Sequence, residues 1–557
     1  MTDWSLYAGR WVALRENDQV ASVGDTAAYA RYAARAKLPK EYLRLMWVAP
    51  QPPHVLIPEW PLAHIRPVLP EEGIWLAGGP VRDLLLRRPL HDWDFAVAGS
   101  GRKIAREVAD TLHTAYYTLD AARDTGRVVV THPVTHRPIT LDFAALRGDD
   151  LAEDLHLRDF TINAMAMTLE GEIIDPHGGQ KDLAAGLIRI TSERSFSDDP
   201  ARLLRAVRQA GTLGFHLETM TEMAIRAQAA KIKSVAAERI QAELCHVLAG
   251  VPAPHSLQAL ADLGLMHHIL PEAKTLQSVR QSWPHHYANT WEHTLAAVSA
   301  VEGLLAMLNG APRPESTHAY VPVPDWAWEQ LTETLMPLQA PLLEYLDAEL
   351  SVEIPRRDLL KWGALYHDTG KAKTRSVDER GLTHFYGHAK VSAETTQARL
   401  RALHFPNRAI DFVIKLVRHH MRLIDFSQSG GSRRSIYRFY RATGESGVGV
   451  VLLALADALA VWGRKLDQKR WLNLLQGAEM LLDDYFHRQE ETIAPPPLLD
   501  GHDLLAMHIP QGPVIGDLLE TLREAQAAGE IATEAEARRL VRSHLDRVEV
   551  NHEIREG

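Results

Sequence analysis

The chain has 557 residues, a formal net charge of −10 and a single cysteine, Cys245. This length exceeds what one hydrophobic core supports, so we expect three or more domains. One cysteine excludes an internal disulfide framework and any multi-cysteine zinc site, and it fits a reducing cytoplasm. We see no run of about 18 apolar residues and predict no membrane span. The negative charge disfavours nonspecific nucleic-acid binding, so any RNA should meet a local basic face.

The predicted elements divide the chain into five parts. The first reads as a small ββαβ module without assignable chemistry, followed by a proline-rich linker around residues 51–61. In the second part strands and helices alternate, which indicates an α/β or α+β fold. The remaining parts show helical periodicity. The expected boundaries are 1–52, 60–195, 196–275, 283–475 and 490–557.

A glycine turn that enters a helix is the first feature with chemistry. The sequence "GGPVRDLLLRRP" begins at Gly78, and Pro80 suits a first helical turn, where its missing N–H costs nothing. Gly78 and Gly79 lack side chains, so a phosphate can approach their backbone. The free N–H groups of the helix start favour an anion. Arg82 adds a planar cationic group.

Carboxylates follow on two predicted strands. In "HDWDFAVAG" the alternation of a strand places Asp92 and Asp94 on one face and Trp93 on the other. Two such carboxylates can hold Mg²⁺, which prefers oxygen ligands. The hairpin "VVVTHPVTHRPITLDFAAL" then puts Asp142 on its polar face as a candidate third carboxylate. A lone Asp-x-Asp is usually a solvated strand edge, but after a glycine turn it favours a metal site.

The glycine turn and the aspartate pair closely resemble the first motif of class II tRNA nucleotidyltransferases and bacterial poly(A) polymerases, in the polymerase-β-like superfamily. The resemblance covers roughly residues 73–275. It implies an α+β multidomain fold, with a nucleotidyltransferase head built on a mixed sheet and an all-α neck. Four further motifs follow in family order: "LRDFTINAMA" (157–166), "DPHGGQKDL" (175–183), "DDPARLLRAVRQAGTLGF" (198–215) and "AERIQAEL" (237–244).

The second motif implies contacts to the triphosphate and ribose from Arg158, Asp159 and Asn163. Family members usually have two arginines before the aspartate, whereas this chain has Leu157 in the first position. Only the three matching residues carry the family's role over to this chain.

The fourth motif implies that Asp199 and Arg202 read the incoming base, with Arg205 also at the nucleotide. Asp accepts hydrogen bonds and Arg donates them, which matches the amino donor and ring-nitrogen acceptor of cytosine and adenine. The pair should pass CTP and ATP and reject UTP and GTP. Without the resemblance, a helix cap and a surface ion pair would be the simpler interpretation. The family's usual Glu before this Asp is here Asp198.

The connection between Asp142 and the second motif is short, "FAALRGDDLAEDLHL". Family members that add a whole CCA end often carry a longer flexible loop here, so the short connection favours CC addition. Full CCA addition, A addition and poly(A) synthesis stay as alternatives.

The second half is rich in histidines and contains "WEHTL" (His293), "LYHDTGK" (His367, Asp368) and "LADAL" (Asp457). This set resembles an HD-domain phosphohydrolase, which implies an all-α fold. Adjacent His367 and Asp368 lie in an apolar helical segment, where burying them without a partner would be costly. The resemblance implies that His293, His367, Asp368 and Asp457 are the core ligands. Imidazole and carboxylate ligands suit a transition metal such as Mn²⁺, Fe²⁺, Ni²⁺ or Zn²⁺.

Additional histidines extend this set. His388 and His419 match positions that hold a second metal or a phosphate in one subclass of HD domains, and His420 could replace His419. Family members with such a domain act as phosphodiesterases or phosphatases on 2′,3′-cyclic or 2′-phosphates, which implies the same class of activity here.

Together these features predict a cytoplasmic, Mg²⁺-dependent enzyme whose partners are a tRNA 3′ end, CTP and ATP, and neither DNA nor a membrane. RNA contacts are expected from "KIK" (231–233), "VRHHMRL" (417–423) and "SRRSIYRFYRATG" (432–444), where cations alternate with aromatic side chains. The tail at 490–557 is a candidate contact for the tRNA body. Two other classes stay open: an HD phosphohydrolase with a silent head, and a noncatalytic RNA-binding protein.

Overall fold

The computed structural model describes residues 7, 10–15, 19–24, 26–38, 43–48, 57–90, 92–134, 136, 138–280, 289–351 and 354–556. The chain forms two compact units. The first comprises Met1–Gly250 with His255–Ile269, and the second comprises Val251–Pro254 with Leu270–Gly557.

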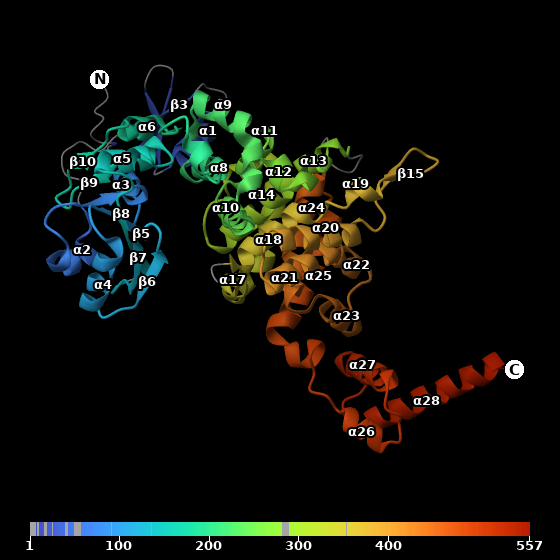
Figure 1. Ribbon diagram of the computed structural model, residues 1–557. Coiled ribbons are helices and arrows are strands. Elements are labelled where there is room, and N and C mark those ends of the chain that lie inside the picture. The colour runs from blue at the N-terminus through green and yellow to red at the C-terminus, as the bar shows by residue number, and fades with distance from the viewer. Residues whose placement is uncertain are drawn as a thin grey trace. The chain divides into compact units, whose positions relative to one another are not determined.

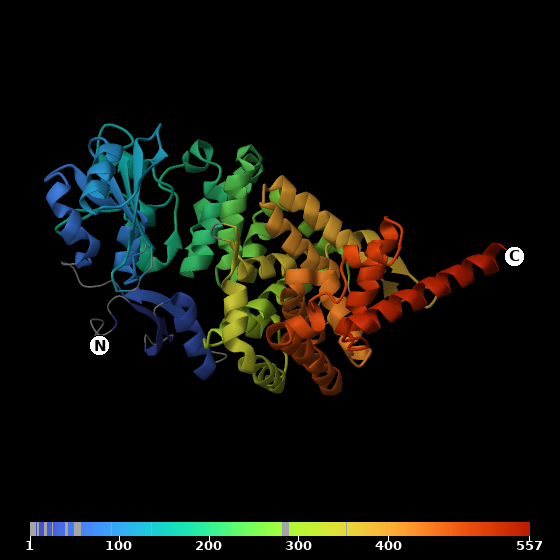
Figure 2. The ribbon, with the colours of Figure 1, turned by 90° about the horizontal axis from the view of Figure 1, so that it is seen from below.

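The N-terminal module has the predicted ββαβ order. Its elements are β1 (Arg10–Leu14), β2 (Val20–Gly24), α1 (Ala27–Lys37) and β3 (Arg44–Val48), and the antiparallel sheet has the order β2-β1-β3. Trp11 packs edge-on against Phe215, so the module lies beside the neck helices of the same unit (Figure 2). Residues 51–56 of the predicted linker lie outside the described residues.

A seven-stranded mixed sheet forms the head, in the order β10-β9-β4-β5-β8-β7-β6 (Figure 1). Within it β5 and β8 pair in parallel, and their described neighbours pair antiparallel. This confirms the expected mixed sheet. The strands are β4 (Ile74–Ala77), β5 (Asp92–Val97), β6 (Tyr116–Asp120), β7 (Thr125–Thr131), β8 (Pro138–Ala145), β9 (Ala166–Met167) and β10 (Ile173–Ile174).

The sheet has an apolar face and a polar face, as the alternating sequence requires. Phe95 of β5 and Phe143 of β8 are buried, and their rings stack with centroids 4.8 Å apart. Helix α4 (Gly101–Thr111) packs on β7 and β8, and α3 (Gly79–Leu85) packs on β5. The aspartates of β5 and β8 lie between these buried positions, on the opposite face.

Helices follow the head, in agreement with the predicted all-α neck. Helix α8 packs on α10. A two-stranded parallel sheet of β11 (Leu187–Ile188) and β12 (His216–Leu217) also contacts α8. Two helices, α5 (Leu151–His156) and α6 (Gly179–Ala185), still lie within the head. The helices after it are α7 (Ser195–Asp198), α8 (Arg202–Leu213), α9 (Thr219–Gln228), α10 (Ala237–Ala249), α11 (Ala253–Asp262), α12 (Met266–Ile269) and α13 (Pro271–Ser278).

Helix α24 is the core of the second unit and packs on α14, α18 and α25. Two short hairpins interrupt the region expected to be all-α: β13 (Glu349–Ser351) with β14 (Ile354–Pro355), and β15 (Ser376–Val377) with β16 (Thr383–His384). The helices up to the tail are α14 (Thr290–Leu308), α15 (Glu315–Tyr320), α16 (Asp325–Leu335), α17 (Gln339–Asp347), α18 (Arg356–Tyr366), α19 (Lys371–Thr374), α20 (His388–Ala402), α21 (Asn407–His419), α22 (Arg422–Gln428), α23 (Arg433–Thr443), α24 (Gly447–Trp462) and α25 (Gln468–His487).

One helical stretch, Arg433–Lys465, contains an 18-residue window that is apolar enough to cross a membrane by length and composition, and the mean hydropathy of that window is 1.8. The sequence pattern did not predict it. In the fold 89% of its apolar window is buried, because it contains the core helix α24. Its hydrophobicity is therefore accounted for by packing inside the second unit.

Replacing Phe143 with alanine should destabilise the head selectively. The ring is fully buried against Phe95, so its removal leaves a cavity that costs about 3–5 kcal/mol. In calorimetry the transition of the head should move to lower temperature while that of the second unit stays in place. Tyr117→Ala, at an exposed position of β6, is the control and should change the head's stability by less than about 0.5 kcal/mol. Equal shifts for the two variants would contradict the assignment of this core.

Candidate functional site

Gly78 links β4 to α3 in a conformation that requires glycine. Its φ is +80°, which L side chains rarely adopt, and a Cβ there would collide with the guanidinium of Arg158. The turn therefore brings the second motif against the first. Gly79 begins α3, with Pro80 in its first turn as the sequence predicts.

Asp92 and Asp94 lie on the polar face of β5, and Trp93 is buried on the other. Asp94 is half-buried and stands in register with Asp142 on β8. Burial, followed by the neighbouring charge of Asp142, raises the pKa of the Asp94 carboxyl to about 6, although Arg158 opposes the shift. A carboxylate pair crowded in this way gains stability from any cation that it binds.

Asp142 occupies the predicted face, but its carboxylate is already engaged. Nε and Nη2 of Arg127 on β7 donate to its two oxygens at 2.8 and 2.7 Å. This bidentate pair neutralises Asp142, so Asp92 and Asp94 are the better metal ligands. A third ligand at Asp142 stays a prediction and would require Arg127 to move.

A pocket of about 410 Å³ lies between these aspartates and a set of arginines. The aspartates can hold divalent cations, and the arginines can bind the oxygens of a triphosphate. The pocket joins residues of the first, second and fourth motifs. Its lining includes Gly78, Gly79, Arg82, Asp92, Asp94, Arg123, Arg147, Arg158, Asp159, Asn163, Asp199, Arg202, Arg205, Arg208 and Gln209.

Asp159 and Asn163 are buried at the base of this pocket, where they orient arginines. Asp159 pairs with Arg205 at 2.9 Å, and Nη1 of Arg82 donates to Asn163 at 2.8 Å. Burial alone would raise the pKa of Asp159, but Arg205 and Asn163 outweigh it and lower the pKa. Direct contact of Asp159 and Asn163 with nucleotide stays a prediction; their observed partners indicate a positioning role.

The base-reading pair is arranged differently from the sequence expectation. Asp199 and Arg202 line the same pocket, but Asp199 pairs with Arg239 of α10 at 2.7 Å. Nη2 of Arg202 donates to the carbonyl oxygen of Leu157 at 2.8 Å, and its Nη1 donates to Ser195 Oγ at 3.0 Å. The two side chains are therefore held separately, each by its own partner.

Arg239 and Gln209 are site residues that the sequence motifs did not single out. Arg239 lies in the fifth motif, whose Glu243 also pairs with Arg208 at 2.6 Å. The spacing of Arg239 and Glu243, one helical turn apart, was a usable signal because it puts both on one face of α10. Gln209 of α8 accepts from Asn163 at 3.0 Å.

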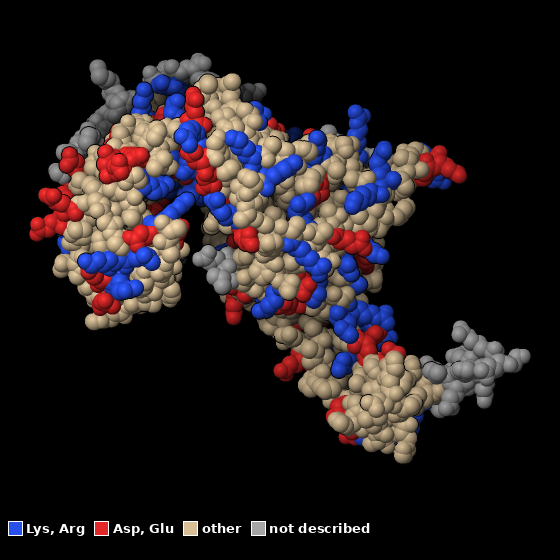
Figure 3. Space-filling view, viewed as in Figure 1, with Lys and Arg blue, Asp and Glu red and all other residues tan. Residues whose placement is uncertain are grey.

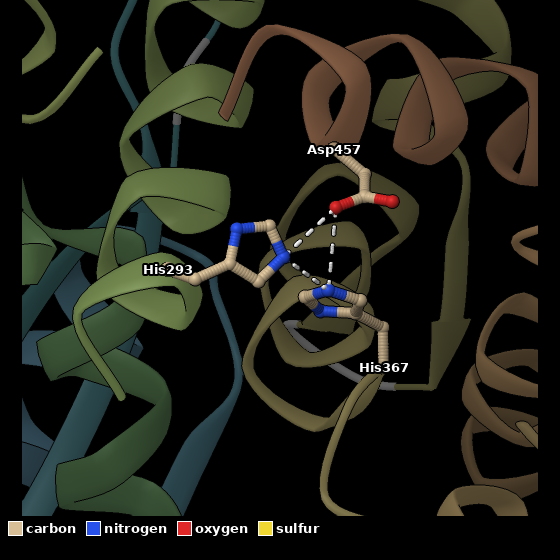
Figure 4. Close-up of side chains that lie close together, drawn as sticks. All are labelled: His293, His367 and Asp457. Carbon is tan, nitrogen blue, oxygen red and sulfur yellow. Dashed lines mark hydrogen bonds and ion pairs between the residues drawn. The ribbon is translucent and has the colours of Figure 1, made fainter. Parts of the chain in front are cut away.

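The second unit gathers the predicted HD residues from separate helices. Side chains of His293 on α14, His367 after α18 and Asp457 on α24 point toward one another (Figure 4). Nε2 of His293 lies 3.1 Å from Nε2 of His367 and 3.0 Å from Oδ1 of Asp457. These three buried side chains form a first group that can hold a metal ion.

Asp368, His388 and His420 form a second group beside the first. Oδ2 of Asp368 lies 3.3 Å from Nε2 of His293, and its Oδ1 lies 3.4 Å from Nε2 of His388. The adjacent His419 does not join either group. Its Nδ1 accepts from Arg422 at 3.0 Å, and the structure brings His420 into the group instead, which is the alternative that the sequence left open.

The histidine rings are oriented so that Nε2 faces the centre. Nδ1 of His367, His388 and His420 each donates to a carbonyl oxygen three residues earlier, at 2.7, 2.9 and 2.7 Å. The neutral rings of His388 and His420 then carry a lone pair on Nε2, and these two Nε2 atoms lie 3.4 Å apart. Facing lone pairs repel one another unless a cation lies between them, so the donor set fits metal ions.

A cavity of about 700 Å³ opens beside this double group, and its lining includes Asp368, Lys371, His388, His420 and Asp457 together with further polar and apolar side chains. Nζ of Lys371 lies 2.6 Å from Asp368. Burial lowers the pKa of His420 to about 4, which keeps its Nε2 available as a ligand at neutral pH. Burial alone would lower the pKa of His367, but Asp368 and Asp457 raise it to about 10.

Three known protein families match successive segments of this chain. The poly A polymerase head domain matches residues 74–189, the probable RNA and SrmB-binding site of polymerase A matches 214–276, and the HD domain matches 340–462. His293 precedes the HD match, and the fold brings it to His367 and Asp457.

Two curated relatives align along most of their length. The A-adding tRNA nucleotidyltransferase of Deinococcus radiodurans is 32% identical over 86% of this chain and 97% of the relative. The chain belongs to the tRNA nucleotidyltransferase family. The CC-adding tRNA nucleotidyltransferase of Thermus thermophilus is 33% identical over 86% of this chain and 95% of its own length.

Solved tRNA nucleotidyltransferases share the fold. A CCA-adding enzyme in complex with CTP superposes with a TM-score of 0.54 at 19% identity, over 88% of this chain and 96% of that one. The predicted head, neck and HD regions are therefore confirmed as the family's fold.

His420→Ala and His419→Ala are a matched pair of neighbouring substitutions. We expect His420→Ala to lose about one equivalent of bound Mn²⁺ per chain in equilibrium dialysis, because the second group loses a ligand. His419→Ala should keep the stoichiometry of the unchanged protein, since its ring is bonded to Arg422. Loss of the ion in the His419 variant alone would refute the ligand assignment.

Proposed function

We propose that this protein extends tRNA 3′ ends by adding CC from CTP. An extension of the same proposal is full CCA addition, in which the terminal A comes from ATP. The observation that carries the proposal is the pocket in which Asp92 and Asp94 face the arginines around Gly78. In the reaction the RNA 3′-oxygen bonds to the α-phosphorus of the nucleotide. The bond from that phosphorus to the bridging oxygen breaks, and diphosphate leaves.

The residues of the pocket divide this work between them. Asp92 and Asp94 would hold Mg²⁺, which when bound lowers the pKa of the attacking hydroxyl and screens the triphosphate. Arg82 and Arg158 would bind phosphate oxygens, and Arg205 would add positive charge from the neck. Asp159 and Asn163 hold two of these arginines in place before nucleotide binds.

The preference for CC addition rests on the segment after β8. β8 ends at Ala145 and α5 begins at Leu151, so only residues 146–150 connect them. Arg147 in this segment forms an ion pair with Asp154 at 3.0 Å, which limits the mobility of this short connection. The relatives with similar identity include both A-adding and CC-adding enzymes, so this local argument favours CC addition where overall similarity is neutral.

Three RNAs discriminate between the candidate activities: a tRNA without CCA, a tRNA ending in CC, and an unrelated RNA. With labelled CTP or ATP, the proposal predicts incorporation of CMP on the first tRNA alone. Incorporation of AMP on the tRNA ending in CC would support A or CCA addition. ATP tails on the unrelated RNA would replace the proposal with poly(A) synthesis, and no incorporation on any RNA would indicate a silent head.

A second activity is proposed for the HD residues, supported by the two adjacent ligand groups and the cavity beside them. A transition metal held by His293, His367 and Asp457, with a second ion at Asp368, His388 and His420, would activate water toward a phosphate ester. The proposed substrates are 2′,3′-cyclic phosphates and phosphomonoesters.

Asp94→Ala and Asp368→Ala should separate the two activities. Asp94→Ala removes a proposed Mg²⁺ ligand of the head, so it should lower nucleotide incorporation by roughly 1,000-fold. The two carboxylates belong to different ligand groups, so the effects should be separate. Asp94→Ala should leave hydrolysis of a 2′,3′-cyclic nucleotide unchanged. Asp368→Ala should give the reverse pattern. Loss of both activities in either variant, with an unchanged melting temperature, would contradict two separate centres.

Arg239 should influence base selection through Asp199, which it contacts at 2.7 Å. Arg239→Ala frees the carboxylate to rotate, so we expect the ratio of kcat/KM for CTP over UTP to fall roughly ten-fold. Arg239→Lys should restore part of the ratio. Arg226→Ala, which removes another exposed ion pair of the neck, serves as the control. An unchanged ratio for Arg239→Ala would exclude this positioning role.

A further inference from the structure

The C-terminal helices have an apolar core of their own. This module consists of α26 (Gly501–Ala506), α27 (Pro513–Ala527) and α28 (Glu534–Glu556). Every residue of its core cluster lies between Leu498 and Leu545. The apolar side of α27 is therefore used inside the module, and contacts to the rest of the second unit come from its other side.

Helix α23 presents a row of arginines on one side. Arg434, Arg438 and Arg441 are spaced by four and three residues, so they share one face of the helix. Phe439 and Tyr440, on the opposite side, are buried in the core of the second unit. We call the three arginines the arginine stripe; they lie in the segment expected to contact RNA.

Carboxylates of the module cover this stripe. Arg441 pairs with Glu520 at 2.8 Å, Arg438 pairs with Glu524 at 2.5 Å, and Arg434 pairs with Glu530 at 2.7 Å. In Figure 3, basic and acidic side chains gather next to each other where α23 meets α27. Glu524 also pairs with Arg434 at 3.0 Å, so each arginine of the stripe has a carboxylate partner and Glu524 bridges two of them.

The contact is open to solvent, and ligands can reach it. A groove of about 500 Å³ lies along it, lined by Arg422, Arg438 and Arg441 together with Tyr437, Glu520 and Glu524. The side chains of Arg438 and Arg441 stay 63% and 62% exposed although they are paired. Exposed ion pairs contribute little stability and are screened by salt, so a competing anion can displace them.

We propose that the arginine stripe is a binding surface for RNA phosphates, which the carboxylates of the module occupy until RNA displaces them. A guanidinium binds phosphate and carboxylate oxygens in the same geometry, so each carboxylate stands where a phosphate oxygen would bind. Successive arginines rise by about 6 and 4.5 Å along the helix, and a polymer of anions satisfies such a row better than a single anion does. The inference rests on the proposed RNA substrate.

The test measures the affinity for a tRNA lacking CCA by fluorescence anisotropy. Glu520→Gln with Glu524→Gln removes the competing carboxylates, so Kd should fall at least three-fold. The control, Glu329→Gln with Glu333→Gln, removes the same charge at the same spacing from the exposed face of α16 and should change Kd by less. Equal effects of the two double variants would overturn the proposal in favour of a general charge effect.

A second pair of variants tests the stripe itself. Arg438→Gln with Arg441→Gln should raise Kd and reduce the slope of log Kd against log salt by about 1–2, because each arginine removed leaves one phosphate without its cation. The exposed pair Arg401→Gln with Arg408→Gln is the control. A slope equal to that of the control overturns the proposal and leaves the carboxylates as a structural contact or a site for an acidic protein segment. A native chain that binds no tRNA would instead refute the proposed function.

Discussion

The parallel pairing of β5 with β8 is the constraint on which the head depends. It places Asp94 beside Asp142 in register and stacks Phe95 on Phe143 behind them. Burial of the aromatic side fixes which face the aspartates take, because a shift of one residue would move them into the core. The negative charge that accumulates on the polar face must be compensated. Arg127 compensates Asp142, whereas Asp92 and Asp94 remain at the pocket, where cations can bind.

Compensation of buried negative charge also governs the rest of the pocket and the HD group. Buried acids are each matched with a base: Asp159 with Arg205, and Asp368 with Lys371. Burying such charges without partners would be costly, so the partners fix side chains before any ligand binds. The pairs that face a ligand, such as Asp199 with Arg239, are more exposed and free to exchange partners. The proposed base selection therefore rests on residues of the helical neck, and the proposed metal binding rests on the sheet.

Much of the head and of the HD group could be predicted from the sequence, because the positions of their key side chains follow from local periodicity or from motifs. The faces of Asp92, Trp93 and Asp94 follow from strand alternation, and His293, His367 and Asp457 follow from their motif context. Partners brought by tertiary packing could not be read in this way. Arg127 contacts Asp142 because the register of β7 on β8 places them opposite each other. Arg239 of α10 contacts Asp199, which directly follows α7, because the helices pack together. His419 and His420 are neighbours in sequence, but helical geometry points them about 100° apart, and only the packed structure decides which faces the metal group.

The aspartates of β5 and the arginines around Gly78 should form a single nucleotide and metal site. A crystal of the full chain soaked with Mn²⁺ and a non-hydrolysable CTP analogue tests it most directly, through the anomalous scattering of manganese. We expect manganese peaks at Asp92 and Asp94. The triphosphate should lie between these aspartates and the arginines Arg82 and Arg158, and the cytosine should lie at Asp199 and Arg202. A nucleotide bound elsewhere, or a head without manganese while the HD group contains it, would contradict the account.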